Sequence, residues 1–194
     1  NYISKHLLPL YNKPIIYYPL ANIMNAGIRD ILLISNPEYI SLYKKLFGNG
    51  SKYGISIQYK SQLYPKGIPE AFIIGKNFIK KSSVCLNLGD HILYGGKLNN
   101  ILIDTAQNFE LSTIFSAKTS YVNDSGVPVF SQEGKLKNIL EKKKKINTNR
   151  VICGIYFYDN DVINKSMKLK ISKRNEIEIT DLNNLYIKEK KLKI

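Results

Sequence analysis

An acidic residue behind a predicted buried strand is the clearest candidate for chemistry in the sequence. Residues 84–88 form a short apolar run, typical of a strand buried on both faces, and Gly89 and Asp90 follow it. In open α/β sheets, ligands bind beyond the carboxyl ends of the strands. Asp90 at such an end could hold Mg²⁺ together with phosphate oxygens of a substrate. The alternative is a turn aspartate that accepts a hydrogen bond from a neighbouring backbone amide.

Two other loops carry polar residues whose types suit a nucleotide or a sugar phosphate. Gln62 and Gly67 follow a predicted strand at 55–59. A glutamine amide can pair with the edge of a base, and a glycine lets a planar ring approach the backbone. Glu141 and Lys142 end another predicted strand, where the glutamate could accept from sugar hydroxyls and the lysine could meet a phosphate. From the pattern alone, an ordinary polar loop explains each pair at least as well.

The sequence gives little support for other kinds of catalytic site. The two histidines, His6 and His91, have no partner at the spacing of a metal site or a nucleophile triad. The sequence also contains no Gly-rich phosphate loop and no Walker-type run.

The elements that must position these residues alternate between strand and helix. Apolar periodicity predicts helices at 14–26, 38–47, 69–78 and 99–108, and strands at 31–34, 55–59, 84–88 and 112–117. This alternation favours an α/β fold with a Rossmann-like, doubly wound, mostly parallel sheet. Strands at 127–130, 136–141 and 151–158 lack long helices between them, so we expect antiparallel additions there, before closing helices at 161–169 and 178–187. We expect a single domain over 1–194.

The composition indicates the cellular compartment and the classes of binding partner that we expect. The net charge is +14, but arginine occurs only at Arg29, Arg150 and Arg174, so scattered lysines supply most of the charge. Readers of nucleic acids usually concentrate arginine and aromatic residues on one face, so we expect no nucleic-acid partner. No apolar run is long enough to span a bilayer, and residues 1–20 lack the features of a secretory signal. Cys85 and Cys153 are expected to be free thiols in a reducing compartment, which predicts a cytoplasmic protein.

Several ordered stretches resemble one family. The chain is similar to the sugar-1-phosphate nucleotidylyltransferases, and within them to the glucose-1-phosphate thymidylyltransferases. The matching stretches are SKHLLP (4–9), NKPIIYYPL (12–20), AGIRDIL (26–32), AFIIG (71–75), LGDHILYG (88–95), GIYFYDNDV (154–162) and EITDLN (178–183). They cover nearly the whole chain, and their agreement in order and spacing makes chance similarity very unlikely.

The resemblance implies a reaction and a role for individual residues. Enzymes of this family join dTTP and glucose 1-phosphate into dTDP-glucose and pyrophosphate, the first step toward dTDP-rhamnose. The resemblance places Lys5 on a nucleotide phosphate, Gln62 and Gly67 on the thymine, and Asp90 on Mg²⁺ and the nucleotide.

For the sugar phosphate, the resemblance implies contacts from Gly126, Glu141, Gly154 and Tyr156, with Lys142 on the phosphate. Lys5, Asp90 and Lys142 are the implied catalytic residues. Residues 1–120 would then be roughly the nucleotide-binding half and 121–194 the sugar-phosphate-binding half. The resemblance also suggests a homotetramer.

The sequence departs from the family pattern at several positions. The usual E-E-K-P reads Leu140-Glu141-Lys142-Lys143, and Ser125 replaces the tyrosine before Gly126. Asn184 replaces an arginine expected near the sugar phosphate, and Lys66 replaces an acidic residue beside the base-binding loop.

The chain also starts after the family's G-G-x-G-T-R-L loop and stops before its W-L-D-T-G-T segment. We therefore expect an incomplete or decayed gene product that is inactive over this span. Two alternatives stay open: a non-catalytic or decayed relative that binds sugar phosphate, and an enzyme of the same fold that uses UTP or CTP.

Overall fold

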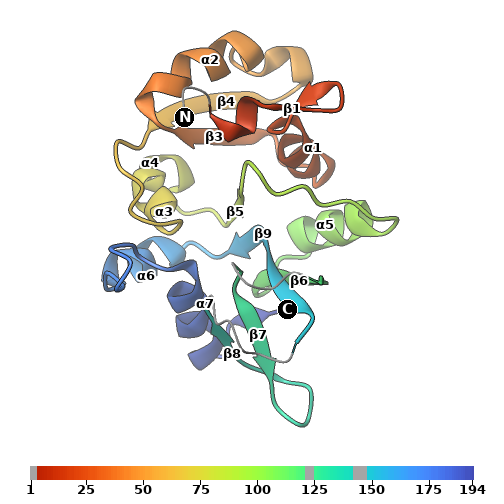
Figure 1. Ribbon diagram of the computed structural model, residues 1–194, viewed down its shortest axis with the longest axis vertical. Coiled ribbons are helices and arrows are strands. Elements are labelled where there is room, and N and C mark those ends of the chain that lie inside the picture. Colours follow the sequence, from red (N-terminus) through yellow and green to blue (C-terminus); the bar gives the residue numbers. More distant parts are fainter. Residues whose placement is uncertain (1–3, 121–124, 142–147) are drawn as a thin grey trace. The chain divides into compact units, whose positions relative to one another are not determined.

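A computed structural model describes residues 4–120, 125–141 and 148–194 of the chain (Figure 1). The described chain divides into two compact units, Asn1–Pro65 with Asn87–Phe109, and Lys66–Leu86 with Glu110–Ile194. The segment Lys66–Leu86 therefore groups with the C-terminal residues, a division that differs from a boundary near residue 120. We describe each unit by itself.

The first unit is built around a parallel pair of strands, β3 (Asp30–Ser35) and β4 (Ser56–Ser61). Their register pairs Asp30 with Ser56 and continues without a shift to Ser35 and Ser61. Helix α2 (Pro37–Phe47) connects the two strands and lies along the pair (Figure 1). The other elements of this unit are η1 (Lys5–Leu7), β1 (Pro9–Leu10), β2 (Lys13–Pro14), α1 (Tyr17–Asn25), η2 (Ser51–Tyr53) and α5 (Leu98–Gln107).

Local sequence explains the bounds of α2 and its attachment. Pro37 occupies the first helical turn, where a missing N–H costs no hydrogen bond, and Glu38 complements the helix dipole. The helix ends at Gly48, whose φ of +61° suits glycine. Tyr43 and Phe47 point into the core of the unit, where each is only 1% exposed. The expected helix at 38–47 is thus confirmed almost residue for residue.

The start of α1 is a correction to the sequence prediction. Pro14 was expected to open a helix at 14–26, but it pairs with Pro9 in the antiparallel hairpin of β1 and β2, and α1 begins at Tyr17. The hairpin is continued by a hydrogen bond from the Ile15 N–H to the Leu8 carbonyl at 3.0 Å. A fixed proline φ suits both an edge strand and a first helical turn, so local propensity could not separate the two.

The second unit contains a four-stranded sheet in the order β10-β6-β9-β5. Strand β6 (Ser112–Lys118) runs parallel to β10 (Leu192–Lys193) and antiparallel to β9 (Arg150–Tyr158), while β5 (Val84–Asn87) lies at the other edge. Strands β7 (Val127–Phe130) and β8 (Leu136–Leu140) form a separate antiparallel pair. The predicted antiparallel additions are therefore confirmed.

The described residues of the second unit also form four helices. They are α3 (Glu70–Ile74), α4 (Lys76–Ile79), α6 (Val162–Lys168) and α7 (Ile179–Lys188). The single helix expected at 69–78 is wrong, because the chain forms two short helices that meet at Gly75. Within the described residues, no helix is long and apolar enough to cross a membrane.

Aromatic side chains dominate the core of the second unit. Tyr158 packs edge-on against Phe72 at 5.4 Å and beside Tyr186 at 5.2 Å between ring centroids. The buried hydroxyl of Tyr158 donates to the Asn183 side-chain oxygen at 2.6 Å, which satisfies both polar groups. The two cysteines are free thiols, as predicted, and burial raises the pKa of Cys85 to about 12.

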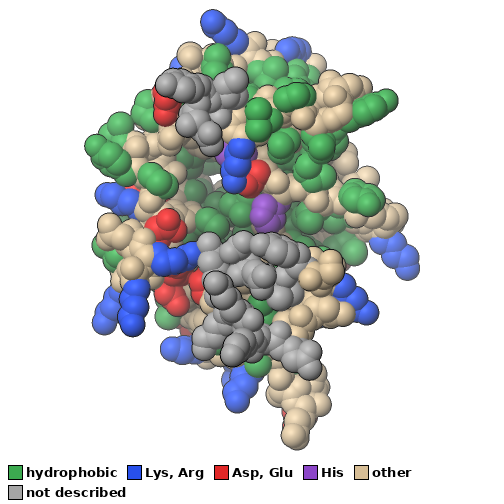
Figure 2. Space-filling view, in the orientation of Figure 1, with side chains coloured by type: hydrophobic (Ala, Val, Ile, Leu, Met, Phe, Trp, Pro, Cys, Tyr) green, Lys and Arg blue, Asp and Glu red, His purple; other side chains and the backbone are tan. Residues whose placement is uncertain are grey.

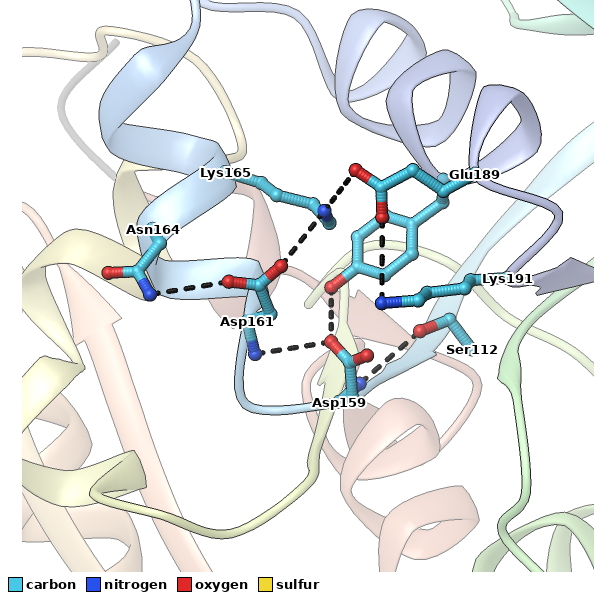
Figure 3. A network of polar contacts seen from close by, with 8 residues as sticks. Ser112, Asp159, Asp161, Asn164, Lys165, Glu189 and Lys191 are labelled. Carbon is cyan, nitrogen blue, oxygen red and sulfur yellow. Dashed lines mark hydrogen bonds and ion pairs between the residues drawn. The ribbon is translucent and has the colours of Figure 1, made fainter.

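A buried lysine ties α6 to the end of α7 (Figure 3). Lys165 is 7% exposed, and its ammonium lies 2.9 Å from the Asp161 carboxylate and 2.6 Å from that of Glu189. The same ammonium lies 5.0 Å from the ring centroid of Tyr186, whose hydroxyl donates to Asp159 at 2.5 Å. Burial alone would lower the pKa of Lys165, but its two carboxylate partners raise the pKa above 10.5.

Replacing Lys165 by methionine should destabilise the protein in a pH-dependent way. The hydrogen bond from Lys165 lowers the pKa values of Asp161 and Glu189 below 3.8 and 4.5. The stabilisation from these two carboxylates is therefore complete above their ordinary pKa values of 3.8 and 4.5. It is lost as pH falls through their lower pKa values in the folded state. The contribution of Lys165 is complete below 10.5 and is lost at more alkaline pH. Urea unfolding should show a larger loss for Lys165→Met at pH 7 than at pH 3.

The matched control is Lys191→Met, since Lys191 is 3.7 Å from Glu189 and its side chain is 52% exposed. We expect that variant to change the unfolding midpoint little. An equal loss for Lys165→Met at both pH values would show that the ion pairs do not stabilise the fold.

Candidate functional site

In the first unit, Asp90 forms an ion pair with Lys5. Asp90 follows the end of β5, as the sequence predicted, and Lys5 begins the short helix η1. The side chain of Asp90 is 28% exposed and that of Lys5 is 66% exposed, so both remain open to solvent and to a ligand. The structure thus brings together two residues that lie 85 positions apart (90 − 5) in the sequence.

Glycine at position 89 allows the close approach of η1. A Cβ atom at Gly89 would lie 3.1 Å from the ring of His6 and 3.0 Å from the Ile16 side chain. The His6 carbonyl in turn accepts a hydrogen bond from the Ile16 N–H at 3.0 Å. This packing places Lys5 next to Asp90.

Two asparagines fasten the Asp90 loop to α1. The Asn87 side-chain amide donates to the Pro19 carbonyl at 3.0 Å, and that of Asn22 donates to the Leu93 carbonyl at 3.3 Å. The loop is therefore held on both sides of Asp90 by side-chain-to-backbone bonds, which restricts where the carboxylate can point.

Local charges keep Asp90 ionised at pH 7, and burial keeps His6 neutral. Burial alone would raise the pKa of Asp90, but the bond and charge of Lys5, with the nearby histidines, hold this pKa below 3.8. Burial lowers the pKa of His6 below 6.5, although the negative charge of Asp90 acts to raise this pKa. Its Nδ1 lies 3.1 Å from the Ser4 hydroxyl and 3.4 Å from that of Tyr43. Asp90 is thus available as an anionic oxygen ligand.

A single carboxylate suits Mg²⁺ only when further ligands come from elsewhere. Within residues 4–120, 125–141 and 148–194, no group of three or more His, Cys, Asp or Glu side chains could hold a metal ion. Mg²⁺ commonly binds one or two carboxylates and completes its shell with water and substrate phosphates. The ionised oxygen of Asp90 fits that kind of site.

Gln62 lies directly beyond the parallel strand pair of the first unit. Its backbone N–H donates to the Ser35 carbonyl at 2.9 Å, which continues the pairing by one residue past Ser61. The residue is therefore fixed at the carboxyl end of a parallel strand, where open α/β sheets bind ligands. Its role in reading a base stays a prediction.

Gly67, in the second unit, has a packing reason for being glycine. Its φ is +103°, and a Cβ atom there would lie 2.0 Å from the Ile177 carbonyl oxygen. Beside it, the Lys66 carbonyl accepts from the Ile177 N–H at 2.8 Å. The main chain at 177 therefore occupies the space of a side chain at 67, a constraint independent of any bound base.

Glu141 is the centre of a polar cluster in the second unit. The hydroxyl of Thr180 donates to one carboxylate oxygen of Glu141, and the guanidinium of Arg174 lies 3.4 Å from the other. Arg174 also forms a double contact with the buried carboxylate of Glu178. Sequence reasoning predicted Glu141 but missed Arg174 and Thr180 as its neighbours, although Thr180 lies in a matching stretch.

Gly126 lies close to this cluster, whereas Gly154 and Tyr156 are both part of the buried strand β9. A Cβ atom at Gly126 would lie 3.4 Å from the Thr180 hydroxyl and 3.3 Å from Ile139. Tyr156 is 4% exposed and stacks on Tyr158, and burial, followed by the charge of Glu141, raises its pKa. Tyr156 therefore belongs to the core that supports the site, and its contact with a sugar stays a prediction.

The departures at 184 and 143 have different outcomes. The Asn184 side chain exchanges two hydrogen bonds with the backbone of Ile139, at 2.8 and 2.9 Å. It thereby fixes strand β8 just before Glu141, a role for which the amide has both a donor and an acceptor. Lys142 and Lys143 lie outside the described residues.

Comparison with known proteins identifies the family. The family model described as nucleotidyl transferase matches residues 1–194. The chain belongs to the nucleotidyl transferase family. Glucose-1-phosphate thymidylyltransferases from Neisseria meningitidis and Mycobacterium tuberculosis are each 42% identical over 192 residues, which is 99% of this chain. The relative from Xanthomonas campestris is 43% identical over 95% of the chain. The chain spans 63–67% of the length of these three relatives.

Solved structures agree with the α/β fold class. A Bacillus anthracis protein, provisionally named a glucose-1-phosphate thymidylyltransferase and solved with sucrose, matches with a TM-score of 0.87 and 29% identity. That match covers 97% of this chain and 76% of the other. A UDP-glucose pyrophosphorylase solved with UDP-glucose matches with a TM-score of 0.82 at 21% identity, over 96% of this chain and 80% of the other. This second likeness concerns the fold alone.

Basic side chains are scattered on the described part of the face drawn in Figure 2, between apolar and neutral areas.

A methyl group at position 67 should be strongly destabilising. Gly67→Ala would place a side chain against the Ile177 carbonyl and in a strained φ region, so we expect a loss of about 2 kcal/mol or more in unfolding free energy. Chemical denaturation measures this loss. Gly95→Ala is the control, because nothing lies within 4 Å of a Cβ there. Equal stability of the two variants would contradict the packing assignment.

Proposed function

We propose that the protein to which this chain belongs is a glucose-1-phosphate thymidylyltransferase. It would convert dTTP and glucose 1-phosphate into dTDP-glucose and pyrophosphate. The observation that carries the proposal is 42–43% identity, over 95–99% of the chain, to three proteins with this name. Membership of the nucleotidyl transferase family independently supports a nucleotidyl-transfer reaction.

The reaction needs positioning and charge neutralisation more than covalent chemistry. A phosphate oxygen of glucose 1-phosphate attacks the α-phosphorus of dTTP, and the bond from that phosphorus to the β-phosphate oxygen breaks. Pyrophosphate leaves with the bonding electrons. Lys5, which is largely exposed, would offer its ammonium to the phosphates once it moves from Asp90. Lys142 would hold the phosphate of the sugar.

The two substrates would be recognised by different residues. Gln62 and Gly67 would each contact the thymine, and Glu141 would accept from glucose hydroxyls, with Gly126, Gly154 and Tyr156 as further sugar contacts. The support for Glu141 is its fixed carboxylate, whose two oxygens have about four acceptor positions in total, while the described contacts use only some of them.

Mg²⁺ is the proposed cofactor, with Asp90 as its ligand from this chain. Bound Mg²⁺ would offset negative charge on the phosphates. The support from this chain is the low pKa of Asp90, which keeps an anionic oxygen available at neutral pH. Supply of dTDP-glucose for dTDP-rhamnose, a homotetrameric assembly and a cytoplasmic location complete the proposal. The first two rest on the family resemblance, and the third rests on the two free thiols.

The whole gene product tests the proposal directly. With Mg²⁺, dTTP and glucose 1-phosphate, we expect pyrophosphate release and a product with the mass of dTDP-glucose. Replacement of dTTP by UTP or CTP at equal concentration should reduce kcat/KM. Dominant use of UTP or CTP would show an enzyme of the same fold with another base preference, and binding of glucose 1-phosphate without turnover would support a non-catalytic relative.

Asp90→Asn should remove most activity and leave the fold intact. The amide keeps the shape of the side chain but loses the anionic oxygen, so we expect kcat/KM to fall about 100-fold or more. Higher Mg²⁺ should recover little of this loss. Asp104→Asn is the matched control, because Asp104 is an exposed residue of α5 that bonds Asn108 at 2.7 Å. Near-normal turnover by Asp90→Asn would reduce Asp90 to a turn residue.

A further inference from the structure

The loop before α7 is built around one arginine. The Ser172 N–H donates to the Glu176 carbonyl at 2.7 Å, and the Asn175 N–H donates to the Ser172 carbonyl at 2.9 Å. The Arg174 N–H donates to the Ser172 hydroxyl at 3.2 Å. These three short-range bonds close the loop into a turn and fix where the side chain of Arg174 begins.

The guanidinium of Arg174 is held in one plane by Glu178. Its Nε donates to one carboxylate oxygen of Glu178 at 3.0 Å, and its terminal nitrogen forms an ion pair with the other oxygen. The Ser172 hydroxyl also donates to Glu178 at 2.7 Å. Glu178 is only 8% exposed, and the side chain of Arg174 is 39% exposed. The double contact to a buried carboxylate restricts the orientation of the guanidinium.

The same terminal nitrogen of Arg174 also reaches Glu141. It lies 3.4 Å from the Oε1 atom, while Thr180 donates to Oε2. Glu141 follows strand β8, and the residues that hold its carboxylate all come from the segment 172–180. Arg174 therefore links two carboxylates. The side chain of Glu178 is 10% exposed, and that of Glu141 is 27% exposed.

We propose that Arg174 is a positioning residue for the sugar phosphate, acting through Glu141. It keeps the Glu141 carboxylate in one orientation, so that acceptor positions not used by Arg174 and Thr180 face the hydroxyls of the sugar. Arg174 does not itself contact the substrate. The inference rests on the proposed function, in which Glu141 binds glucose 1-phosphate.

The chemistry of this position requires arginine rather than any cation. A guanidinium presents several N–H groups in a fixed fork, so it can bond Glu178 twice and still direct an N–H toward Glu141. A lysine ammonium is a point charge on a flexible stem and would satisfy one carboxylate without fixing the direction of the other. The positive charge of Arg174 therefore accounts for only part of its effect on the orientation of the Glu141 carboxylate.

Steady-state kinetics of the whole gene product tests the proposal, with Arg174→Gln and Arg174→Lys as variants. We expect Arg174→Gln to raise KM for glucose 1-phosphate about tenfold, because a charge-assisted contact to Glu141 is lost. Arg174→Lys should raise it less. KM for dTTP should stay within about twofold in both, since only the sugar-binding carboxylate is affected.

A double-mutant cycle separates a role through Glu141 from a direct one. If Arg174 acts through Glu141, Arg174→Gln should add little to the KM change already caused by Glu141→Gln. If the KM changes of the two single variants instead multiply in the double variant, the proposal is overturned, because the two residues then contact the substrate independently. Arg29→Gln is the matched control, because Arg29 bonds the Met24 and Ile28 carbonyls and should leave both KM values unchanged.

Wild-type behaviour distinguishes the failure of this inference from that of the proposed function. If the wild-type protein turns over dTTP and glucose 1-phosphate but the Arg174 variants keep its KM values, the inference alone fails. If wild type forms no dTDP-glucose, the proposed function fails and the inference falls with it. Should Arg174→Gln not fold, Arg174→Lys decides, because an unchanged KM for glucose 1-phosphate in that variant overturns the proposal.

Discussion

The organisation of the second unit depends on the pairing of one buried carboxylate. Glu178 directly precedes α7 and is 8% exposed, so its charge would be costly without partners. Ser172 and Arg174 supply these partners, which folds the preceding loop back onto the start of the helix. Helix α7 then carries Thr180 to Glu141. A structural need, the satisfaction of a buried charge, thus also determines the geometry of the candidate sugar site.

In the first unit, side-chain-to-backbone hydrogen bonds restrict the candidate residue Asp90. Asp90 lies in a loop that Asn87 and Asn22 fasten to α1, and the loop packs against η1, which carries Lys5. Opposite charges then meet at the end of β5 and remain open to solvent. Both candidate sites therefore combine an ionisable group that a ligand could use with neighbours that leave it few orientations.

Much of the fold could be predicted from local pattern. The strands at β3, β5, β6 and β9 and the helices α2, α5 and α7 lie within a few residues of their expected positions, because apolar periodicity and capping residues are local signals. Two elements could not be predicted in this way. Pro14 pairs with Pro9 in the β1–β2 hairpin, and the helical region at 70–79 is divided at Gly75, so neither feature follows from helical propensity alone.

The sequence by itself determined the family resemblance, the alternation of strands and helices, and the candidates Asp90, Gln62 and Glu141. These follow from residue type and spacing along the chain. Only the tertiary structure decided that Lys5 neutralises Asp90, that Gly67 makes room for the main chain at 177, and that Asn184 bonds Ile139. The same holds for the link from Glu178 through Arg174 to Glu141. The reason is physical: apart from Arg174 and Glu178, which are four residues apart, these residues come from distant segments of the chain, and packing decides which of them meet.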